Sequence, residues 1–206
     1  MSDQKRPYKM KKRAELEEQT RRRITESAVE LHEKLGPART PISAIAERAG
    51  VRRSTVYRHF PDEEALFAAC SSHWAAANPP PDPQEWAAIE DTAERTETAL
   101  RELYAFYGRT EGMFTSLLRD EPQVAPVQHG MDEFRGYLRA VRDVLTRGRG
   151  LRGAPARRTR AAIGHALAFP TWVSLTGEQG LSDADAVALM CALVEDAEAQ
   201  KLRGVA

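Results

Sequence analysis

The sequence predicts an all-α protein of about nine helices, and three observations favour this fold class. Apolar residues recur at three- and four-residue spacing along most of the 206-residue chain, which is the pattern of a half-buried helix. Several of these segments open with a helix-start signal, a capping side chain followed by proline or an acidic residue. No segment shows the apolar–polar alternation that is typical of a half-buried strand.

The chain opens with a basic segment, residues 1–14, which holds few apolar residues. We predict that this segment is a disordered arm. A first helix is expected from about Glu15 to Leu35, where Gly36 and Pro37 end it. The apolar stripe of this helix comprises Ile24, Ala28, Leu31 and Leu35.

Residues 41–60 predict two short helices separated by Gly50. Because Thr40 precedes Pro41, we expect the threonine hydroxyl to cap the first of them. Gly50 stands where the chain must leave the helix, and we expect a positive φ there. The second short helix carries mostly hydrogen-bond donors, namely Arg52, Arg53, Ser54, Thr55, Tyr57, Arg58 and His59. A donor-rich helix held against a small apolar helix can present its donors to a DNA groove, so this segment predicts DNA binding.

Capping and proline signals divide the rest of the chain. A fourth helix begins near Asp62, whose carboxylate can cap it, and ends before the prolines at 79–81. Asp82 and Pro83 open a long helix to about residue 107. Further helices are expected over about 110–119, 131–147, 156–176 and 182–200. Pro170 is expected to kink the third of these, and Ser182 to cap the last.

Residues 17–70 resemble the TetR family of bacterial transcription regulators. The resemblance depends on IAERAGV, TVYRHF and the acidic-capped helix that follows. It implies an N-terminal three-helix helix-turn-helix DNA-binding domain at 15–61, joined to a larger helical ligand-binding and dimerisation domain at 62–206. Many relatives carry a phosphate-binding lysine near position 63, where this chain has Glu63 followed by Glu64. We therefore expect that phosphate contact to be missing or replaced.

The expected DNA contacts divide into base readers and backbone anchors. Arg53 is the first choice for reading a base, because arginine binds guanine bidentately; Arg52 lies just before it. Ser54 and Thr55 can contact a base, a thymine methyl group or a phosphate. The backbone-contacting positions of the family correspond to Thr40, Tyr57, Arg58 and His59. Alternatively, Arg58 is a solvated charge and Tyr57 packs against the first helix.

The charge distribution agrees with DNA binding. The whole chain has a formal net charge of zero, but residues 1–60 hold 15 Lys and Arg against 8 Asp and Glu, a net charge of +7. Residues 61–206 hold 15 against 22, a net charge of −7. A basic first third is the electrostatic footprint of a DNA-binding head. The basic arm at 1–14 either reaches along the DNA or is a solubilising tail.

The larger domain contains enough aromatic side chains to line an apolar cavity. The candidate ligand-pocket residues are Trp86, Tyr104, Tyr107, Phe114, Phe134, Tyr137, His165, Phe169 and Trp172. Each of these is alternatively an ordinary core residue, and His165 a buried histidine or a dimer contact. The resemblance implies a homodimer formed through the last two helices. The candidate interface residues are Ile163, Leu167, Val187, Met190 and Val194.

The sequence shows no pattern of a catalytic, metal or membrane-spanning protein. Cys70 and Cys191 lack metal-ligand spacing, and no nucleophile elbow or phosphate-binding glycine loop occurs. We therefore expect no enzymatic activity, no metal and no cofactor. Without a long apolar run or a signal peptide, the chain is expected to be soluble and cytoplasmic, with no membrane partner.

These features predict a sequence-specific transcriptional regulator. Its expected partners are a double-stranded DNA operator, a second copy of the chain and a small apolar or amphipathic effector. The favoured mode is a repressor that the effector releases from its operator. The alternative is a constitutive or architectural DNA-binding dimer without an effector.

Overall fold

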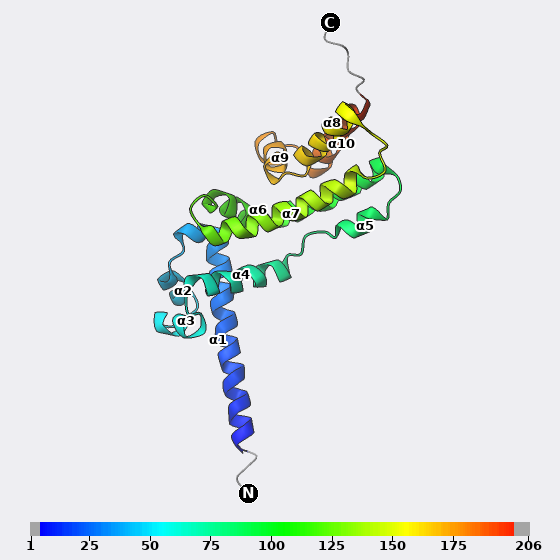
Figure 1. Cartoon of the computed structure of the whole chain (residues 1–206). Coiled ribbons are helices and arrows are strands. Elements are labelled where there is room, and N and C mark those ends of the chain that lie inside the picture. The colour runs from blue at the N-terminus through cyan, green and yellow to red at the C-terminus, as the bar shows by residue number, and fades with distance from the viewer. Residues whose placement is uncertain (1–4, 200–206) are drawn as a thin grey trace. The chain divides into compact units, whose positions relative to one another are not determined.

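The computed structural model describes residues 5–199, which form ten α-helices and no strand. The predicted all-α class is confirmed, with ten helices where the sequence indicated about nine (Figure 1). The helices, with a 3₁₀ turn η1 and a π-helical segment η2, are α1 (Lys5–Leu35), η1 (Pro37–Arg39), α2 (Ile42–Arg48), α3 (Arg53–His59), α4 (Glu63–Ala77), α5 (Pro83–Ala87), α6 (Thr92–Asp120), α7 (Ala125–Thr146), α8 (Gly153–Ala166), α9 (Phe169–Val173), η2 (Ser174–Glu178) and α10 (Asp183–Ala199).

Contacts along the chain define two compact units, each described by itself below. Unit 1 comprises residues 1–79 and 112–131, and unit 2 comprises residues 80–111 and 132–206. This division differs from the predicted boundary between residues 61 and 62. Helix α4 stays with the helix-turn-helix because its Leu66 and Cys70 are buried in the same apolar cluster as Ile24.

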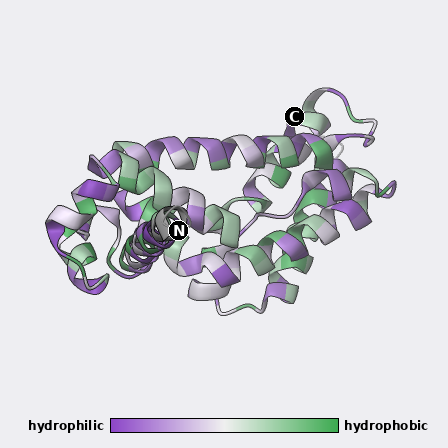
Figure 2. Ribbon diagram, turned by 90° about the horizontal axis from the view of Figure 1, so that it is seen from below, coloured by the Kyte–Doolittle hydropathy of each residue, from purple (hydrophilic) through white to green (hydrophobic). Residues whose placement is uncertain are grey.

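Helix α1 starts ten residues earlier than the sequence indicated. The structure has helix from Lys5 onward, so the predicted disordered arm is wrong for residues 5–14; residues 1–4 lie outside the described part. Side chains 10–19 are all exposed, and Figure 2, which views α1 nearly end-on, shows much of this helix in the hydrophilic colour. The segment lacks glycine and is rich in good helix formers. An ion pair at i, i+4 spacing between Arg13 and Glu17 (3.1 Å) adds local support.

The core of unit 1 joins α1, α2, α3 and α4. The buried cluster comprises Ile24, Ala28, Ile42, Ile45, Ala46, Ala49, Val56, Phe60, Leu66 and Cys70. Figure 1 shows α2 and α3 beside the middle of α1. Gly50 has a φ of +63°, as predicted, at the turn between α2 and α3.

Capping in unit 1 was predicted correctly at one helix and incorrectly at another. The N–H of Ala65 donates to the Asp62 carboxylate at 2.7 Å, which confirms Asp62 as the cap of α4. The Thr40 hydroxyl instead donates back to the Gly36 carbonyl at 2.7 Å, and Pro41 is the cap residue of α2. The 3₁₀ turn η1, which the sequence reading did not include, places the Thr40 hydroxyl within reach of the end of α1.

The end of α6 is joined to the end of α1 through polar contacts within unit 1, which we term the α1–α6 clasp. Asp120 accepts from the N–H of Ala38 (3.0 Å), and Arg119 donates to the Leu35 carbonyl (2.8 Å). The Ser116 hydroxyl donates to the carbonyl of Glu33 (2.9 Å). Because the last carbonyls of a helix lack partners within it, these side chains satisfy groups that α1 leaves open.

In unit 2 the predicted helix from residue 83 to about 107 is broken. Helix α5 ends at Ala87, and Asp91 starts α6 by accepting hydrogen bonds from the N–H groups of Ala93 (2.9 Å) and Glu94 (2.8 Å). Helix α6 then continues through Gly108 to its end, so a separate helix at 110–119 does not form. A glycine inside a helix costs only about 1 kcal/mol.

Where the sequence predicted a kink at Pro170, the structure has two separate helices. Helix α8 ends at Ala166, and Pro170 occupies the first turn of α9, where a missing N–H leaves no hydrogen bond unmade. The predicted cap of the last helix is confirmed, because the N–H of Asp185 donates to the Ser182 hydroxyl at 3.1 Å.

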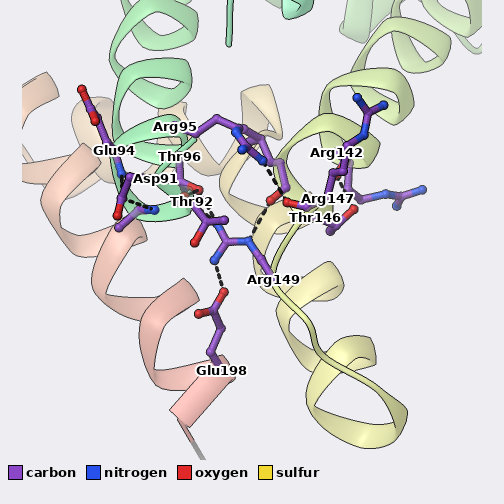
Figure 3. A network of polar contacts seen from close by, with 12 residues as sticks. Asp91, Thr92, Glu94, Arg95, Thr96, Arg142, Thr146, Arg147, Arg149 and Glu198 are labelled. Atoms are coloured by element: carbon purple, nitrogen blue, oxygen red, sulfur yellow. Dashed lines mark hydrogen bonds and ion pairs between the residues drawn. The ribbon is translucent and has the colours of Figure 1, made fainter. Parts of the chain in front are cut away.

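Two buried arginines fix the connections of unit 2 (Figure 3). Arg95 donates to the carbonyls of Ile89 (2.8 Å) and Arg147 (2.8 Å). Arg149 donates to the carbonyls of Leu145 (2.7 Å) and Thr92 (3.0 Å). Arg149 also pairs with Glu198 of α10. These two guanidinium groups thus stabilise the loop after α7 and the start of α6.

Candidate DNA-binding site

Helix α3 has one buried and one open face. Val56 and the following Phe60 are each 1% exposed and anchor it in the core of unit 1. The side chains that remain exposed are those of Arg52, Arg53, Ser54, Tyr57 and Arg58. This is the division of faces that presenting hydrogen-bond donors to a groove requires.

Arg53 is held in place by its neighbour one turn along. Its Nη2 donates to the Tyr57 hydroxyl at 3.1 Å, and the guanidinium carbon lies 5.5 Å from the centre of the tyrosine ring. The hydrogen bond to Tyr57 raises the pKa of Arg53. Tyr57 therefore orients the guanidinium of Arg53, the predicted base reader, on the exposed face of α3. This is a second role for Tyr57, besides the predicted contact with the DNA backbone.

The other three residues predicted to contact DNA are less exposed to solvent. Thr40, Thr55 and His59 are half-buried. Burial, together with the charges of Arg58 and Arg21, lowers the pKa of His59, so this ring is neutral at neutral pH. Its Nε2 atom is buried and has no hydrogen-bond partner within the described residues. A phosphate contact by this nitrogen would require the ring to turn.

Arg21 of α1 supports the recognition helix, a role that the sequence reading did not assign. Its Nη1 donates to the carbonyl of His59 (2.9 Å), and its guanidinium lies 4.3 Å from the centre of the Phe60 ring. The neighbouring Arg22 pairs with Glu26. Three consecutive arginines in the sequence gave no sign of which one would turn toward the end of α3.

The predicted pocket aromatics mostly gather in unit 2, around Tyr107. This ring contacts those of Tyr104, Phe134, Phe169 and Trp172 at centroid distances of 5.2–6.4 Å. The hydroxyls of Tyr104 and Tyr107 donate to carbonyls at the end of α8 (2.9 and 2.7 Å). Burial raises the pKa of both tyrosines. Their polar tips are thus bonded within the unit, and their use as a ligand pocket stays a prediction.

The remaining pocket candidates are Trp86, Tyr137, Phe114 and His165, and they lie in different places. Trp86 and Tyr137 belong to unit 2, where they bond Glu102 (2.8 Å) and the Pro81 carbonyl (2.9 Å). Phe114 lies in unit 1 with its ring against Trp74 at 6.0 Å. His165 is exposed on α8. The structure therefore places neither Phe114 nor His165 in the Tyr107 cluster, because helix faces and not residue type decide which rings meet.

The five predicted interface residues lie inside the protomer. Helices α8 and α10 pack against each other, and their buried positions, each at most 6% exposed, are Ile163, Leu167, Val187, Met190 and Val194. The apolar stripe of each helix is used within unit 2. The large apolar side chains that α10 exposes are Leu189 (48%) and Leu193 (40%), which the sequence reading did not include, and the predicted interface stays a prediction.

Helices α2 and α3 form a helix-turn-helix motif whose second helix exposes a donor-rich face. Among the described residues, no group of His, Cys, Asp or Glu side chains could hold a metal ion. No helix in that part of the chain is long and apolar enough to span a bilayer.

A family model matches the helix-turn-helix part of the chain. Residues 24–70 match the model of the bacterial regulatory proteins, tetR family. This segment is thus a DNA-binding domain of the TetR type. No curated protein matches the sequence.

Solved structures share the fold over most of the chain. A TetR-like transcriptional regulator from Rhodococcus sp. RHA1 is 17% identical, with a TM-score of 0.62 over 88% of this chain and 97% of that one. The fatty acid degradation regulator FadR from Bacillus halodurans is 16% identical (TM-score 0.56; 86% and 97%). FadR from Bacillus subtilis in complex with stearoyl-CoA is 20% identical (TM-score 0.54; 86% and 97%).

Proposed function

We propose that this protein is a sequence-specific DNA-binding repressor, which binds a two-fold operator as a homodimer and leaves it when a small ligand binds. The observation that carries the proposal is the open face of α3, on which Arg53 is oriented by Tyr57 while Val56 anchors the helix. An arginine fork placed in the major groove can bind guanine bidentately. The net charge of +7 over residues 1–60 supplies the non-specific attraction to phosphate.

The DNA-binding part is tested with the purified full-length protein and labelled duplexes from the region upstream of its own gene. Fluorescence anisotropy should show binding to one of these duplexes at physiological salt, tighter than to a scrambled duplex by about a thousandfold or more. Equal affinity for the scrambled duplex would contradict sequence-specific binding.

The homodimer is proposed to form through the outer faces of α8 and α10. On α10 this face includes Leu189 and Leu193, whose exposure exceeds that of nearly every other large apolar side chain in unit 2. The exposed residues next to these leucines, Ala188 and Ala192, are small and allow close approach of a second helix. A dimer places two recognition helices on one duplex, so half-sites about one helical turn apart are expected.

An apolar or amphipathic effector is proposed to act through unit 2. The aromatic cluster around Tyr107 supports this part of the proposal. Proteins of the same fold that include a fatty acid degradation regulator and a transcriptional regulator in complex with stearoyl-CoA also support it. The anisotropy assay should therefore show loss of DNA binding when a long-chain fatty acid or its coenzyme A thioester is added.

An effector-free DNA-binding dimer is the alternative, and one observation favours it. The hydroxyls of Tyr104 and Tyr107 are already bonded to main-chain carbonyls, and the rings pack on one another. If DNA affinity is unchanged by a panel of apolar and amphipathic compounds, the alternative replaces the ligand-released repressor.

A further inference from the structure

Unit 1 contains a surface hollow of about 160 Å³ that lies beside the helix-turn-helix and apart from the aromatic cluster of unit 2. Its floor is apolar, and its members come from α2, α4 and the segment that leads into α7: Ile42, Ile45, Leu66, Phe67, Val124 and Pro126. An engineered apolar cavity of about 150 Å³ holds one benzene molecule. By size, the hollow accommodates a single ring.

Two carboxylates line this hollow, those of Glu63 and Glu64 in the first turn of α4. Both are exposed, and within the described residues neither forms an ion pair. Arg53 is close enough to Glu63 to feel its charge, but its guanidinium donates to Tyr57. Glu63 occupies a position near which many relatives of the family carry a phosphate-binding lysine, and in this chain its carboxylate lines the hollow.

His32 adds a buried acceptor to the lining. Its side chain is 8% exposed, and burial lowers its pKa to about 4, so the ring is neutral at neutral pH. The Cys70 thiol donates to the Phe67 carbonyl (3.1 Å), and its sulfur lies 3.5 Å from His32 Nδ1. We assign the imidazole proton to Nδ1, facing the sulfur, because the thiol donates to the Phe67 carbonyl; this tautomer leaves Nε2 as an acceptor. No partner for Nε2 is found within the described residues.

The remaining polar group in the lining is also an acceptor. The Thr40 hydroxyl uses its hydrogen on the Gly36 carbonyl, so toward the hollow it offers lone pairs only. The lining thus combines an apolar floor, three kinds of hydrogen-bond acceptor and two negative charges. A ligand that matches this lining carries one ring and donates hydrogen bonds from a positive charge.

We propose that this hollow is a ligand site of unit 1 that binds a small organic cation, with an aromatic ring against Ile45, Phe67 and Val124 and an ammonium group at Glu63 and Glu64. The site is independent of the proposed effector of unit 2, and its occupancy can be measured without DNA. Charge-assisted hydrogen bonds to carboxylates are stronger than neutral ones, so the cation is distinguished from a neutral molecule of the same shape.

The test uses benzylamine as the probe, with benzyl alcohol as its neutral match, and the full-length protein. Calorimetry should give saturable benzylamine binding with a dissociation constant on the order of millimolar, as expected for so small a ligand. Benzyl alcohol should bind at least about tenfold more weakly. The ¹⁵N resonance of His32 Nε2 should shift when benzylamine is added.

Variants locate the binding. The double substitution Glu63→Gln with Glu64→Gln should weaken benzylamine binding about tenfold or more, and Val124→Phe should abolish it by filling the hollow. Glu47→Gln removes an exposed carboxylate of the same unit that does not line the hollow, and should leave the affinity unchanged. The proposal is overturned if benzylamine does not saturate, if benzyl alcohol binds equally well, or if the Val124 variant retains the wild-type affinity.

Discussion

Asp120 at the end of α6 accepts a hydrogen bond from the backbone N–H of Ala38 at 3.0 Å. This bond fixes η1, the turn that connects α1 to the helix-turn-helix. The same carboxylate pairs with Arg119 at 2.8 Å, and its side chain is only 5% exposed. All residues of the α1–α6 clasp belong to unit 1, so the clasp holds the last part of α6 against the end of α1 within that unit.

The substitution Asp120→Asn should destabilise unit 1 by about 1–3 kcal/mol, because Arg119 loses its charged partner at a covered position. Urea unfolding monitored by circular dichroism measures the change. The Arg119 hydrogen bond is the main cause that holds the pKa of Asp120 below its ordinary value. A group whose pKa is depressed in the folded state contributes stability above its unfolded pKa of about 4 and loses it as the pH falls through the folded pKa.

The stability difference between wild type and Asp120→Asn should therefore be constant above about pH 5 and shrink as the pH falls below about 4. A difference that grows on acidification would show that Asp120 is not held ionised by the clasp.

The substitution Gly36→Ala should be more damaging than a glycine replacement elsewhere in unit 1. Gly36 has a φ of +89°, and a Cβ atom there would collide with Arg119 and Asp120. Gly50 has a φ of +63° but open space around it, so Gly50→Ala is the matched control for backbone strain alone. We expect the control to cost about 1 kcal/mol and Gly36→Ala at least about 2 kcal/mol. Equal melting temperatures for the two variants would refute the close packing at Gly36.

In unit 2, Arg149→Lys should lower the free energy of unfolding by roughly 2 kcal/mol or more. The Arg149 side chain is 4% exposed and joins α6, α7 and α10 through its planar fork, which a lysine ammonium cannot reproduce. Arg160→Lys is the control, because the side chains of Arg160 and its partner Asp143 are 44% and 59% exposed. This substitution should change stability by less than about 0.5 kcal/mol. Chemical denaturation of both variants checks the difference, and similar losses would remove the special role of Arg149.

Dimerisation should respond to the outer face of α10 and not to the buried faces with which α8 and α10 pack on each other. Leu193→Glu, at an exposed position, should give a folded monomer in light scattering, whereas Ile163→Glu should unfold unit 2 because this side chain is 1% exposed. Circular dichroism distinguishes the two outcomes. A Leu193→Glu protein that remains dimeric would place the interface on another surface.

The parts of the fold that the sequence predicted correctly are those set by local signals. The Asp62 and Ser182 caps and the positive φ of Gly50 depend on a few adjacent residues. The errors involve weaker signals or distant contacts. Gly108 resembles a helix end but lies within α6, where Trp172 approaches its Cβ position at 3.8 Å, and Thr40 bonds Gly36 across a 3₁₀ turn.

The candidate sites show the same difference. The open face of α3 followed from the order of residues within one short helix, which fixes their directions once Val56 is buried. Which aromatic rings meet, and which stripe of α8 and α10 is covered, depends on helix rotation against partners distant in the sequence. The pocket and interface assignments therefore stay predictions: Phe114 and His165 lie outside the Tyr107 cluster, and the five interface candidates are buried within the protomer. The contact of Arg21 with the end of α3 likewise depends on residues distant in the sequence.

Replacing Arg53 and Arg58 in turn should separate base reading from phosphate binding. Arg53→Ala should cost about 1–3 kcal/mol on the operator and relax specificity at one base pair of each half-site. Arg58→Ala should weaken binding to all sequences and reduce the slope of log affinity against log salt by about one. Salt titrations of both variants measure the contrast, and indistinguishable behaviour would refute the assignment of the two roles.

The most direct test of sequence-specific DNA binding is selection of duplexes from a random pool by the wild-type protein and by Arg53→Ala, at one fixed salt concentration. The account predicts that the wild type enriches a two-fold symmetric site with a guanine in each half, and that the variant loses the preference at that base pair while keeping the others. The account is contradicted if the wild type enriches no sequence, or if Arg53→Ala selects the same site with the same preference.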